Sequence, residues 1–542
     1  MRLCEPSLPS AVTFLAGRVA VFRLVFLLLT VSGFLAVPGW AASKPNVLVI
    51  LADDLGWGDV SCYQATSAWT TTHLDRLARE GLRFTDAHAA SSLCTPSRYA
   101  LLTGRYAWRG RLKQGVLQGY HPPLIEPGRV TLASWLRAQG YATAAVGKWH
   151  LGLDWVRTGP GLDNVDFGLP FARGPLAHGF ESFFGLSASL DMPPYVWLDG
   201  DRATRVPTAA VADSPPPKLW RAGPISSDFV MEEVQSRLTE RAVAFLAERA
   251  ASRDGRPFFL YLALASPHTP LLPTGDYVGR SGATPYGDFV QQMDADIGAV
   301  LAALERGGLA DNTLVIVTSD NGFAPAADLP AQLRARHDPS GGLRGYKSDL
   351  YEGGHRIPFI VRWPAVIPGG GTRSALIGQH DLFATCADLL DATLPADVAE
   401  DSVSFLPVLR GVVDDQGQGP RKTLINHSAE GRFAIREGRW KLLLWPGSGG
   451  WSPPTPNPSV WLKTERADLS TLPPFQLYDL ETDPAEATNL AEVHPDRVQR
   501  LGRMLRADLE RGRSTPGPAQ PVVLRDWPQI HWIPSFGPPA GH

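Results

Sequence analysis

Cysteine is scarce in this chain, with four among 542 residues: Cys4, Cys62, Cys94 and Cys386. These counts exclude a scaffold built on disulfide bonds. Removal of an N-terminal segment containing Cys4 would leave three cysteines, so at least one thiol stays outside any intramolecular bridge. Whether Cys62 and Cys386 pair remains open. A free thiol in an oxidising compartment is a liability unless it is buried or chemically changed.

An excess of charge of one sign is also absent, because 51 Lys and Arg residues stand against 54 Asp and Glu residues. A net charge of −3 gives no electrostatic reason to expect a nucleic acid as partner. Hydrophobic residues at 44% and charged residues at 19% are typical of globular proteins. The 53 glycines and 48 prolines exceed the usual share and indicate long ordered loops.

Only one long apolar run is present, "LVFLLLTVSGFLAV" at residues 24–37, after Arg18 and Arg23. The run is shorter than the roughly 20 residues that span a bilayer, and small residues follow it. This pattern predicts a cleaved signal peptide over residues 1–42, and an uncleaved N-terminal anchor is the alternative. We therefore expect an exported protein, periplasmic or secreted, without stable membrane insertion.

Four shorter apolar runs alternate with stretches of helical periodicity. The expected strands are 47–52, 141–146, 258–265 and 313–318, and the expected helices are 72–81, 131–140, 237–251 and 289–308. Continuous apolar runs suit strands buried on both faces, as in a parallel sheet. The alternation predicts an α/β domain over residues 43–410, with a large, mostly parallel sheet sandwiched by helices.

The character of the chain changes after residue 410. "GVVDDQGQGP" at 411–420 has the composition of a linker, and "FAIREGRWKLLLW" at 433–445 predicts a hairpin turning at Glu437 and Gly438. A charged helix is expected at 495–511. Residues 411–542 therefore predict a smaller C-terminal subdomain, with a short antiparallel sheet, a helix and an extended tail.

Polar residues follow each of the four predicted central strands. They are Asp53, Asp54, Lys148, His150, His268, Asp320 and Asn321. In open α/β sheets, ligands bind outside the carboxyl ends of the strands. The oxygen donors suit Ca²⁺ or Mg²⁺ rather than Zn²⁺, and the basic side chains suit an anionic substrate. Taken singly, an aspartate pair can form a turn, and a lone histidine is more often structural.

Cys94 lies in the stretch "SSLCTPSRYALLTGR". Pro96 and Ser97 are suited to the first turn of a helix, which would place Cys94 just before a helix N-terminus, where free backbone N–H groups attract anions. Arg98 follows one turn later. A buried structural cysteine is the general alternative, but polar residues rather than an apolar face follow this thiol.

"CTPSRYALLTGR" resembles the signature of the sulfatase family, C-x-P-x-R followed by T-G, within the alkaline-phosphatase-like superfamily. Other blocks resemble that family in the expected order: "PNVLVILADDLGWGD", "GYATAAVGKWHLG", "HGFESFFG", "SPHTP", "TSDNG" and "LRGYKSDLYEGGHRIPFIVRWP". The last block adds Lys347. The resemblance covers residues 44–364 well and the remainder more loosely.

The resemblance implies that a formylglycine-generating enzyme oxidises Cys94 to Cα-formylglycine during export, so the free thiol would disappear. It also implies a bound Ca²⁺, with Mg²⁺ the less favoured ion. The implied metal ligands are Asp53, Asp54, Asp320 and Asn321, with modified Cys94 and a sulfate oxygen completing the shell.

The same resemblance implies hydrolysis of a sulfate ester. A hydroxyl of the hydrated aldehyde would attack sulfur with help from Arg98, and His150 would assist the later expulsion of sulfate. His268 would protonate the leaving oxygen, while Lys148 and Lys347 neutralise charge on the sulfate. The expected substrate is a sulfated carbohydrate, with aryl sulfates as artificial substrates.

Three other interpretations stay open. The chain can be a phosphate or phosphonate ester hydrolase of the same superfamily, a non-catalytic protein that binds sulfated glycans, or an enzyme that uses an unmodified thiol. Separately, Trp451 and Trp461 lie in a loop at 446–474 that is rich in Pro and Gly. These rings can stack on a sugar or cover the site, or can pack within a surface loop.

Overall fold

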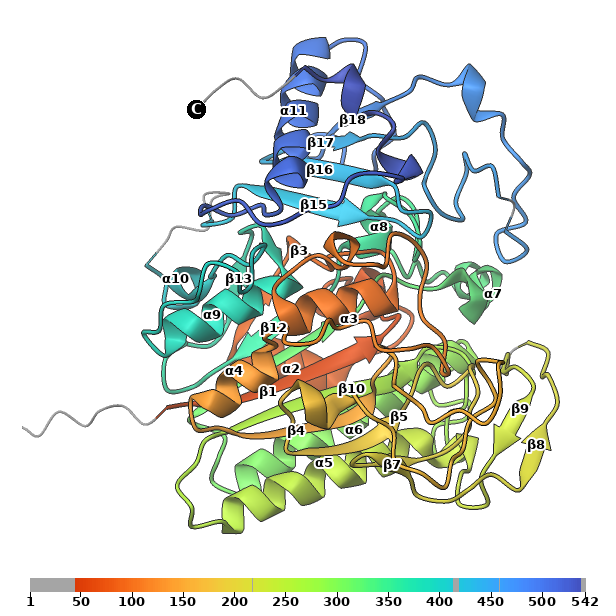
Figure 1. Ribbon diagram of the computed structural model, residues 1–542, viewed down its shortest axis with the longest axis vertical. Helices are drawn as coiled ribbons and strands as arrows, with labels where there is room; N and C mark the ends of the chain where they lie inside the picture. The colour runs from red at the N-terminus through yellow and green to blue at the C-terminus, as the bar shows by residue number, and fades with distance from the viewer. Residues whose placement is uncertain (1–43, 217, 413–418, 458, 538–542) are drawn as a thin grey trace, which may run out of the picture. The chain divides into compact units, whose positions relative to one another are not determined.

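A ten-stranded mixed sheet forms the centre of the computed structural model (Figure 1). The structure describes residues 44–216, 218–412, 419–457 and 459–537, so the predicted signal peptide at 1–42 lies outside the described residues. In spatial order the strands are β13 (Gly371–Arg373), β2 (Leu82–Phe84), β12 (Phe359–Arg362), β11 (Thr313–Ser319), β1 (Asn46–Asp53), β10 (Phe258–Pro267), β4 (Ala142–Lys148), β5 (Ser182–Leu186), β6 (Leu198–Asp199) and β7 (Arg202–Ala203).

The four strands predicted from apolar runs are neighbours at the middle of this sheet, in the order β11-β1-β10-β4, and all pair in parallel. Their residues are almost entirely buried, as expected for strands covered on both faces. Because parallel neighbours end at one edge, the polar residues after them converge. Gly147 permits the close packing of β4 on β10, since a Cβ there would lie 1.7 Å from the Ala263 carbonyl oxygen.

Helices cover both faces of the sheet. Side chains alternate along β1, so Val47 and Val49 pack in one core cluster and Leu48 and Ile50 in the other. The first cluster includes residues of α3 (Cys94–Thr103), α4 (Leu132–Ala138), α9 (Leu382–Leu389) and α10 (Leu406–Leu409). The second includes residues of α2 (Thr72–Glu80), α5 (Val234–Ala251), α6 (Pro285–Arg306) and α7 (Leu329–Arg334).

Three smaller sheets complete the fold. Two are two-stranded: β3 (Ala87–His88) with β14 (Ile377–Gly378), and β8 (Ala209–Val211) with β9 (Gly223–Ile225). The third is antiparallel and joins β15 (Thr423–His427), β16 (Phe433–Glu437), β17 (Trp440–Leu443) and β18 (Gln476–Asp479). Helix α11 (Pro495–Arg511) packs on it (Figure 1). The predicted fold class, hairpin and C-terminal helix are confirmed, while the boundary at residue 410 stays a prediction.

Ion pairs connect the C-terminal sheet to the rest of the chain. Arg436 of β16 donates to both carboxylate oxygens of Asp86, at 2.6 and 2.7 Å. Lys441 of β17 donates to Glu352 at 2.9 Å, at the start of α8 (Glu352–His355). From Pro45 onward the chain accordingly forms one compact unit. Among the described residues, no helix has both the length and the apolar character to cross a membrane.

Replacing a buried residue of α11 tests how far this helix stabilises the C-terminal sheet. Leu505 is fully buried in the cluster that α11 forms with this sheet, whereas Arg503 on the same helix is exposed. We expect Leu505→Ala to lower the free energy of unfolding by about 2–5 kcal/mol, because it leaves a cavity. Arg503→Ala should change it by about 0.5 kcal/mol or less in urea denaturation. Equal effects would contradict this packing.

Candidate active site

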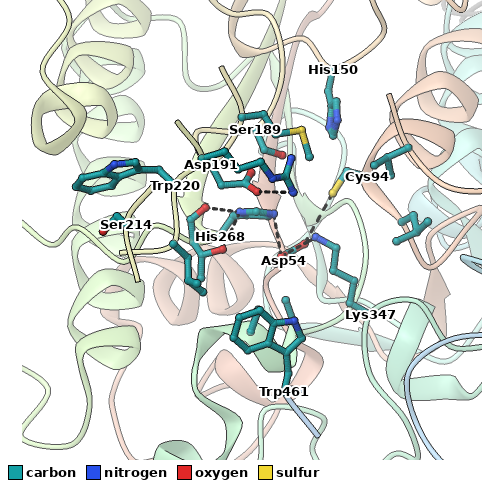
Figure 2. Close-up of a pocket in the computed structure, with 18 of the residues that line it drawn as sticks. Asp54, Cys94, His150, Ser189, Asp191, Ser214, Trp220, His268, Lys347 and Trp461 are labelled. Carbon is teal, nitrogen blue, oxygen red and sulfur yellow. Dashed lines mark hydrogen bonds and ion pairs between the residues drawn. The ribbon is translucent and has the colours of Figure 1, made fainter. Parts of the chain in front are cut away.

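All ten residues predicted for the site come together at the carboxyl edge of the central strands. Asp53 ends β1, Lys148 ends β4, and Asp320 directly follows β11, while Cys94 begins α3. Figure 2 shows Asp54, Cys94, His150, His268 and Lys347 around a single pocket. The fold thus brings together residues that are far apart in the sequence, as in the contact of Lys347 with Asp54, which are 293 positions apart.

Asp53 and Asp320 are held by buried cations. The Lys148 ammonium donates to both oxygens of Asp53, at 2.8 and 2.6 Å. Arg98 donates to Asp320 Oδ2 through Nε at 2.9 Å and Nη2 at 2.7 Å, and Nη2 also lies 3.5 Å from Asp53 Oδ1. Although burial opposes ionisation, Lys148 and Arg98 keep the pKa of Asp53 below its ordinary value. Both carboxylates are therefore acceptors of charge-assisted hydrogen bonds.

Asp54 lies at the centre of the cluster and accepts from two side chains. Lys347 donates to its two oxygens at 2.6 and 2.8 Å, and Asn321 Nδ2 donates to Oδ1 at 2.8 Å. Its backbone is left-handed, with φ 66°, and its N–H donates to Asp320 Oδ1 at 3.1 Å. A left-handed aspartate is uncommon, and such strained residues concentrate at functional sites.

Cys94 is the first residue of α3, one position further into the helix than the sequence predicted. Its sulfur lies 3.7 Å from Asp53 Oδ1 and 3.9 Å from Asp54 Oδ1. The residue is 2% exposed, and burial raises the pKa of its thiol well above the ordinary value. Cys62 and Cys386 are free as well, so the described residues contain no disulfide.

Both histidines line the cavity that contains Cys94 (Figure 2). His150 donates from Nε2 to the Leu117 carbonyl at 2.7 Å, and its Nδ1 is buried without a partner among the described residues. Burial, followed by the charges of Lys148 and Arg98, lowers the pKa of His150 well below its ordinary value. The imidazole is therefore neutral, with Nδ1 free to accept. His268 Nε2 lies 3.4 Å from Asp54 Oδ2.

The oxygen-rich part of this cluster fits a divalent cation. Asp53, Asp54, Cys94 and His268 place potential ligand atoms within 4.8 Å of one another. Asn321 Oδ1 is buried with no hydrogen-bond partner within the described ranges, which leaves an amide oxygen unused beside Asp54. Carboxylate and amide oxygens are ligands that Ca²⁺ and Mg²⁺ accept. Three cationic side chains already balance the three aspartates, so a divalent ion would make the site strongly positive.

A cavity of about 420 Å³ opens from Cys94 toward solvent. Trp451 and Trp461 line it, as the sequence allowed. Its lining also includes Ser189, Asp191 and Trp220, which sequence reasoning missed. These residues lie between β5 and β9, in a segment without helical or strand periodicity, so no sequence signal pointed to them. Thr95 was missed too: its hydroxyl donates to the His150 carbonyl at 3.1 Å and fixes that loop.

This fold, with carboxylates and cations gathered at the strand ends, is the arrangement of alkaline-phosphatase-like hydrolases. The Sulfatase family model matches residues 45–392. Relatives that are more than 30% identical over most of their length agree with this match, so the chain belongs to the sulfatase family. Members of this family are sulfuric ester hydrolases.

Three relatives illustrate the similarity. N-acetylgalactosamine-6-O-sulfatase of Bacteroides thetaiotaomicron is 35% identical over 508 residues, covering 86% of this chain and 93% of the relative. Arylsulfatase A of Bos taurus is 37% identical over 497 residues, covering 89% and 91%. Steryl-sulfatase of Mus musculus is 33% identical over 575 residues, covering 93% and 89%.

Solved structures agree with the fold. One from Bacteroides thetaiotaomicron, described under the metabolism of multiple glycosaminoglycans, has a TM-score of 0.75 and 34% identity, and covers 86% of this chain and 99% of its own. A sulfatase from Pseudoalteromonas has a TM-score of 0.66 and 23% identity, covering 93% and 95%. At that identity the second likeness shows the fold alone.

The unused amide oxygen of Asn321 makes the cation site testable by binding alone. We expect the purified chain, treated with EDTA and dialysed, to bind one Ca²⁺ in isothermal titration calorimetry. Asn321→Ala keeps all three carboxylates and should weaken Ca²⁺ binding about tenfold or more, at least the loss seen for groups that only support metal ligands. Asn164→Ala, at an exposed loop position, is the matched control. Unchanged affinity in Asn321→Ala would exclude this oxygen as a ligand.

Proposed function

We propose that this sulfatase removes sulfate from a sulfated carbohydrate, using Cys94 as formylglycine and a bound Ca²⁺. The observation that carries the proposal is the convergence of all ten predicted residues in one cluster with Cys94, whose sulfur here stands in for the formylglycine oxygens. The name of the bacterial relative, N-acetylgalactosamine-6-O-sulfatase, supports a carbohydrate substrate. The reaction converts R–O–SO₃⁻ and water into R–OH and hydrogen sulfate.

Burial of Cys94 agrees with modification before folding. The side chain is 2% exposed at the N-terminus of α3, so a modifying enzyme could not reach it in the folded chain. We propose that a formylglycine-generating enzyme acts during export, directed by residues 1–42. When present, formylglycine supplies a hydrated aldehyde as nucleophile, and Ca²⁺ supplies positive charge at the sulfate oxygens.

Side chains of this protein would hold the metal, neutralise charge and transfer protons. Asp53, Asp54, Asp320 and Asn321 would hold the metal, and Arg98 would orient the nucleophile. Lys148 and Lys347 would offset negative charge that develops on the sulfate. His150, neutral with a free Nδ1, would accept a proton from the formylglycine hydrate. His268 Nε2, on the cavity side, would donate a proton to the leaving oxygen.

An unmodified thiol nucleophile is disfavoured by the site itself. The reactive form of cysteine is the thiolate, and burial beside Asp320 and Asp53 raises the pKa of Cys94 rather than lowering it. A non-catalytic binding role also lacks support, because no expected catalytic side chain is missing. Phosphate and phosphonate esters remain the chemical competitor, since a positively charged site attracts them equally.

Mass spectrometry of the peptide 84–98, released by trypsin from protein made in its native host, tests the modification directly. We expect a mass lower than that of the thiol form by the exchange of H₂S for one oxygen. Cys94→Ala should lower kcat/KM for 4-nitrophenyl sulfate by about a thousandfold or more, as for other lost nucleophiles. Cys62→Ala is the matched control and should retain activity.

Two outcomes would contradict the proposal. An unmodified thiol in active protein would remove formylglycine from the mechanism. Faster hydrolysis of 4-nitrophenyl phosphate than of 4-nitrophenyl sulfate would move the assignment to phosphate esters.

The role of His268 is tested by varying the leaving group. Nitrophenolate leaves without a proton, whereas an alkoxide requires one. We therefore expect His268→Ala to lower kcat/KM about 10²- to 10⁴-fold for sulfates of alkyl alcohols, and much less for 4-nitrophenyl sulfate. An equal loss on both substrates would show that His268 does not act as the acid.

A further inference from the structure

One wall of the active-site cavity carries acceptors that nothing in the chain satisfies. Ser189 Oγ and Asp191 Oδ1 are buried and have no hydrogen-bond partner within the described part of the chain. Asp191 is 8% exposed and Ser189 2% exposed, and both line the cavity that contains Cys94. Figure 2 shows the two side by side near His268. A buried carboxylate oxygen without a partner is destabilising, so its retention needs a reason.

The neighbouring backbone holds Asp191 in this position. Its carbonyl accepts from the Arg221 backbone N–H at 3.1 Å and from the Tyr195 hydroxyl at 3.2 Å. The Met192 N–H donates to the Ser189 carbonyl at 2.9 Å and closes a turn. Arg221 also approaches Asp191 Oδ2, with Nη2 at 3.3 Å. One carboxylate oxygen therefore has a cation beside it, and the other has no partner at the cavity wall.

The chemistry of an aspartate carboxylate limits what can fill that place. An ionised carboxylate only accepts hydrogen bonds, so the matching group must be a donor such as a hydroxyl or an amide N–H. A second sulfate or a carboxylate on the substrate offers no donor to Asp191 Oδ1. An aryl or steroid ring offers no hydroxyl there either, and would leave Asp191 Oδ1 unsatisfied.

Aromatic surface completes the cavity around this acceptor. Trp220 is fixed by its indole N–H, which donates to the Ala212 carbonyl at 3.0 Å, and by its own carbonyl, which accepts from the Ser214 N–H at 2.9 Å. Trp461, from the loop at 446–474, also lines the cavity (Figure 2). A rigid indole gives a sugar ring's C–H face a packing surface while polar groups fix its orientation. The volume of about 420 Å³ is within the usual range for small-molecule sites.

We propose that Asp191 determines specificity by accepting a hydrogen bond from a free hydroxyl of the sulfated sugar ring, with Trp220 packing against that ring. This inference rests on the proposed sulfatase activity and narrows its substrate class. The substrate is a sulfated sugar whose group facing Asp191 is an uncharged hydroxyl, and the sulfate occupies the end of the cavity at Cys94.

Kinetics of Asp191→Ala on two kinds of substrate test this proposal. The sugar substrates are monosulfated hexoses and N-acetylhexosamines with the sulfate at each available position, and the reference is 4-nitrophenyl sulfate, which has no hydroxyl. We expect kcat/KM for the preferred sugar to fall about 10- to 100-fold, the effect of losing a hydrogen bond to a charged group. The value for 4-nitrophenyl sulfate should change by less than about threefold, within the range of minor repacking.

Asp201→Ala serves as the matched control, because this carboxylate lies ten residues along the chain in an exposed pair with Arg202. It should leave both substrates unaffected. Deoxy analogues of the preferred sugar then identify the hydroxyl. Its removal should lower kcat/KM for the unaltered protein by the same factor as Asp191→Ala, and should have little further effect in that variant.

The outcomes separate failure of this inference from failure of the proposed function. An equal decrease in kcat/KM for the sugar and the aryl sulfate would indicate that Asp191 has only a structural role. If removal of the hydroxyl lowered kcat/KM as much in Asp191→Ala as in the unaltered protein, a hydrogen bond between that hydroxyl and Asp191 would be excluded. Turnover of 4-nitrophenyl sulfate without turnover of any sulfated sugar would overturn the inference and leave the sulfate-ester chemistry standing. No turnover of either by protein that contains formylglycine would overturn the proposed function itself.

Discussion

The active site depends on mutual neutralisation of buried charges. Asp53, Asp54 and Asp320 are at most 2% exposed and are held by Lys148, Lys347 and Arg98, which are at most 6% exposed. Removing one partner from such a buried pair typically destabilises a protein by about 3–5 kcal/mol, because a charge is left without compensation. The fold must therefore deliver these six side chains together or not at all. The ends of β1, β4 and β11 meet at one edge and supply Asp53, Asp54, Lys148 and Asp320, while Arg98 comes from α3 and Lys347 from the segment between α7 and α8.

That geometric rule explains how much could be predicted from the sequence. The apolar runs around β1, β4, β10 and β11 contain no charged residue, so their number, their burial and the polar residues that follow them could be predicted directly. Cys94 and Lys347 lie on no such strand, and only the family resemblance brought them to the site. The antiparallel pairing of β12 with β11 had no signal in the sequence, because the three apolar residues of β12 do not specify which strand lies beside it.

The cavity wall could not be predicted, for a physical reason. Ser189, Asp191 and Trp220 belong to a long connection whose strands β8 and β9 are short and contain no buried residue. Their positions are set by single contacts, such as the Tyr195 hydroxyl on the Asp191 carbonyl, and not by a repeating pattern. The residues at the strand ends follow the regular scaffold, whereas these three lie on irregular segments, which can vary with little effect on the core.

The C-terminal sheet supports the site as well as its own core. The Ser92 N–H, two residues before Cys94, donates to the His427 carbonyl of β15 at 3.0 Å. The Ser348 N–H, next to Lys347, donates to the Ser92 carbonyl at 2.8 Å, and the Ser348 carbonyl accepts from the Ala429 N–H at 3.0 Å. The segments that carry Cys94 and Lys347 are thus hydrogen-bonded to each other and to the region after residue 420. Loosening of the C-terminal sheet would therefore move Cys94 and Lys347 together. The packing of this sheet and the geometry of the candidate site thus depend on each other.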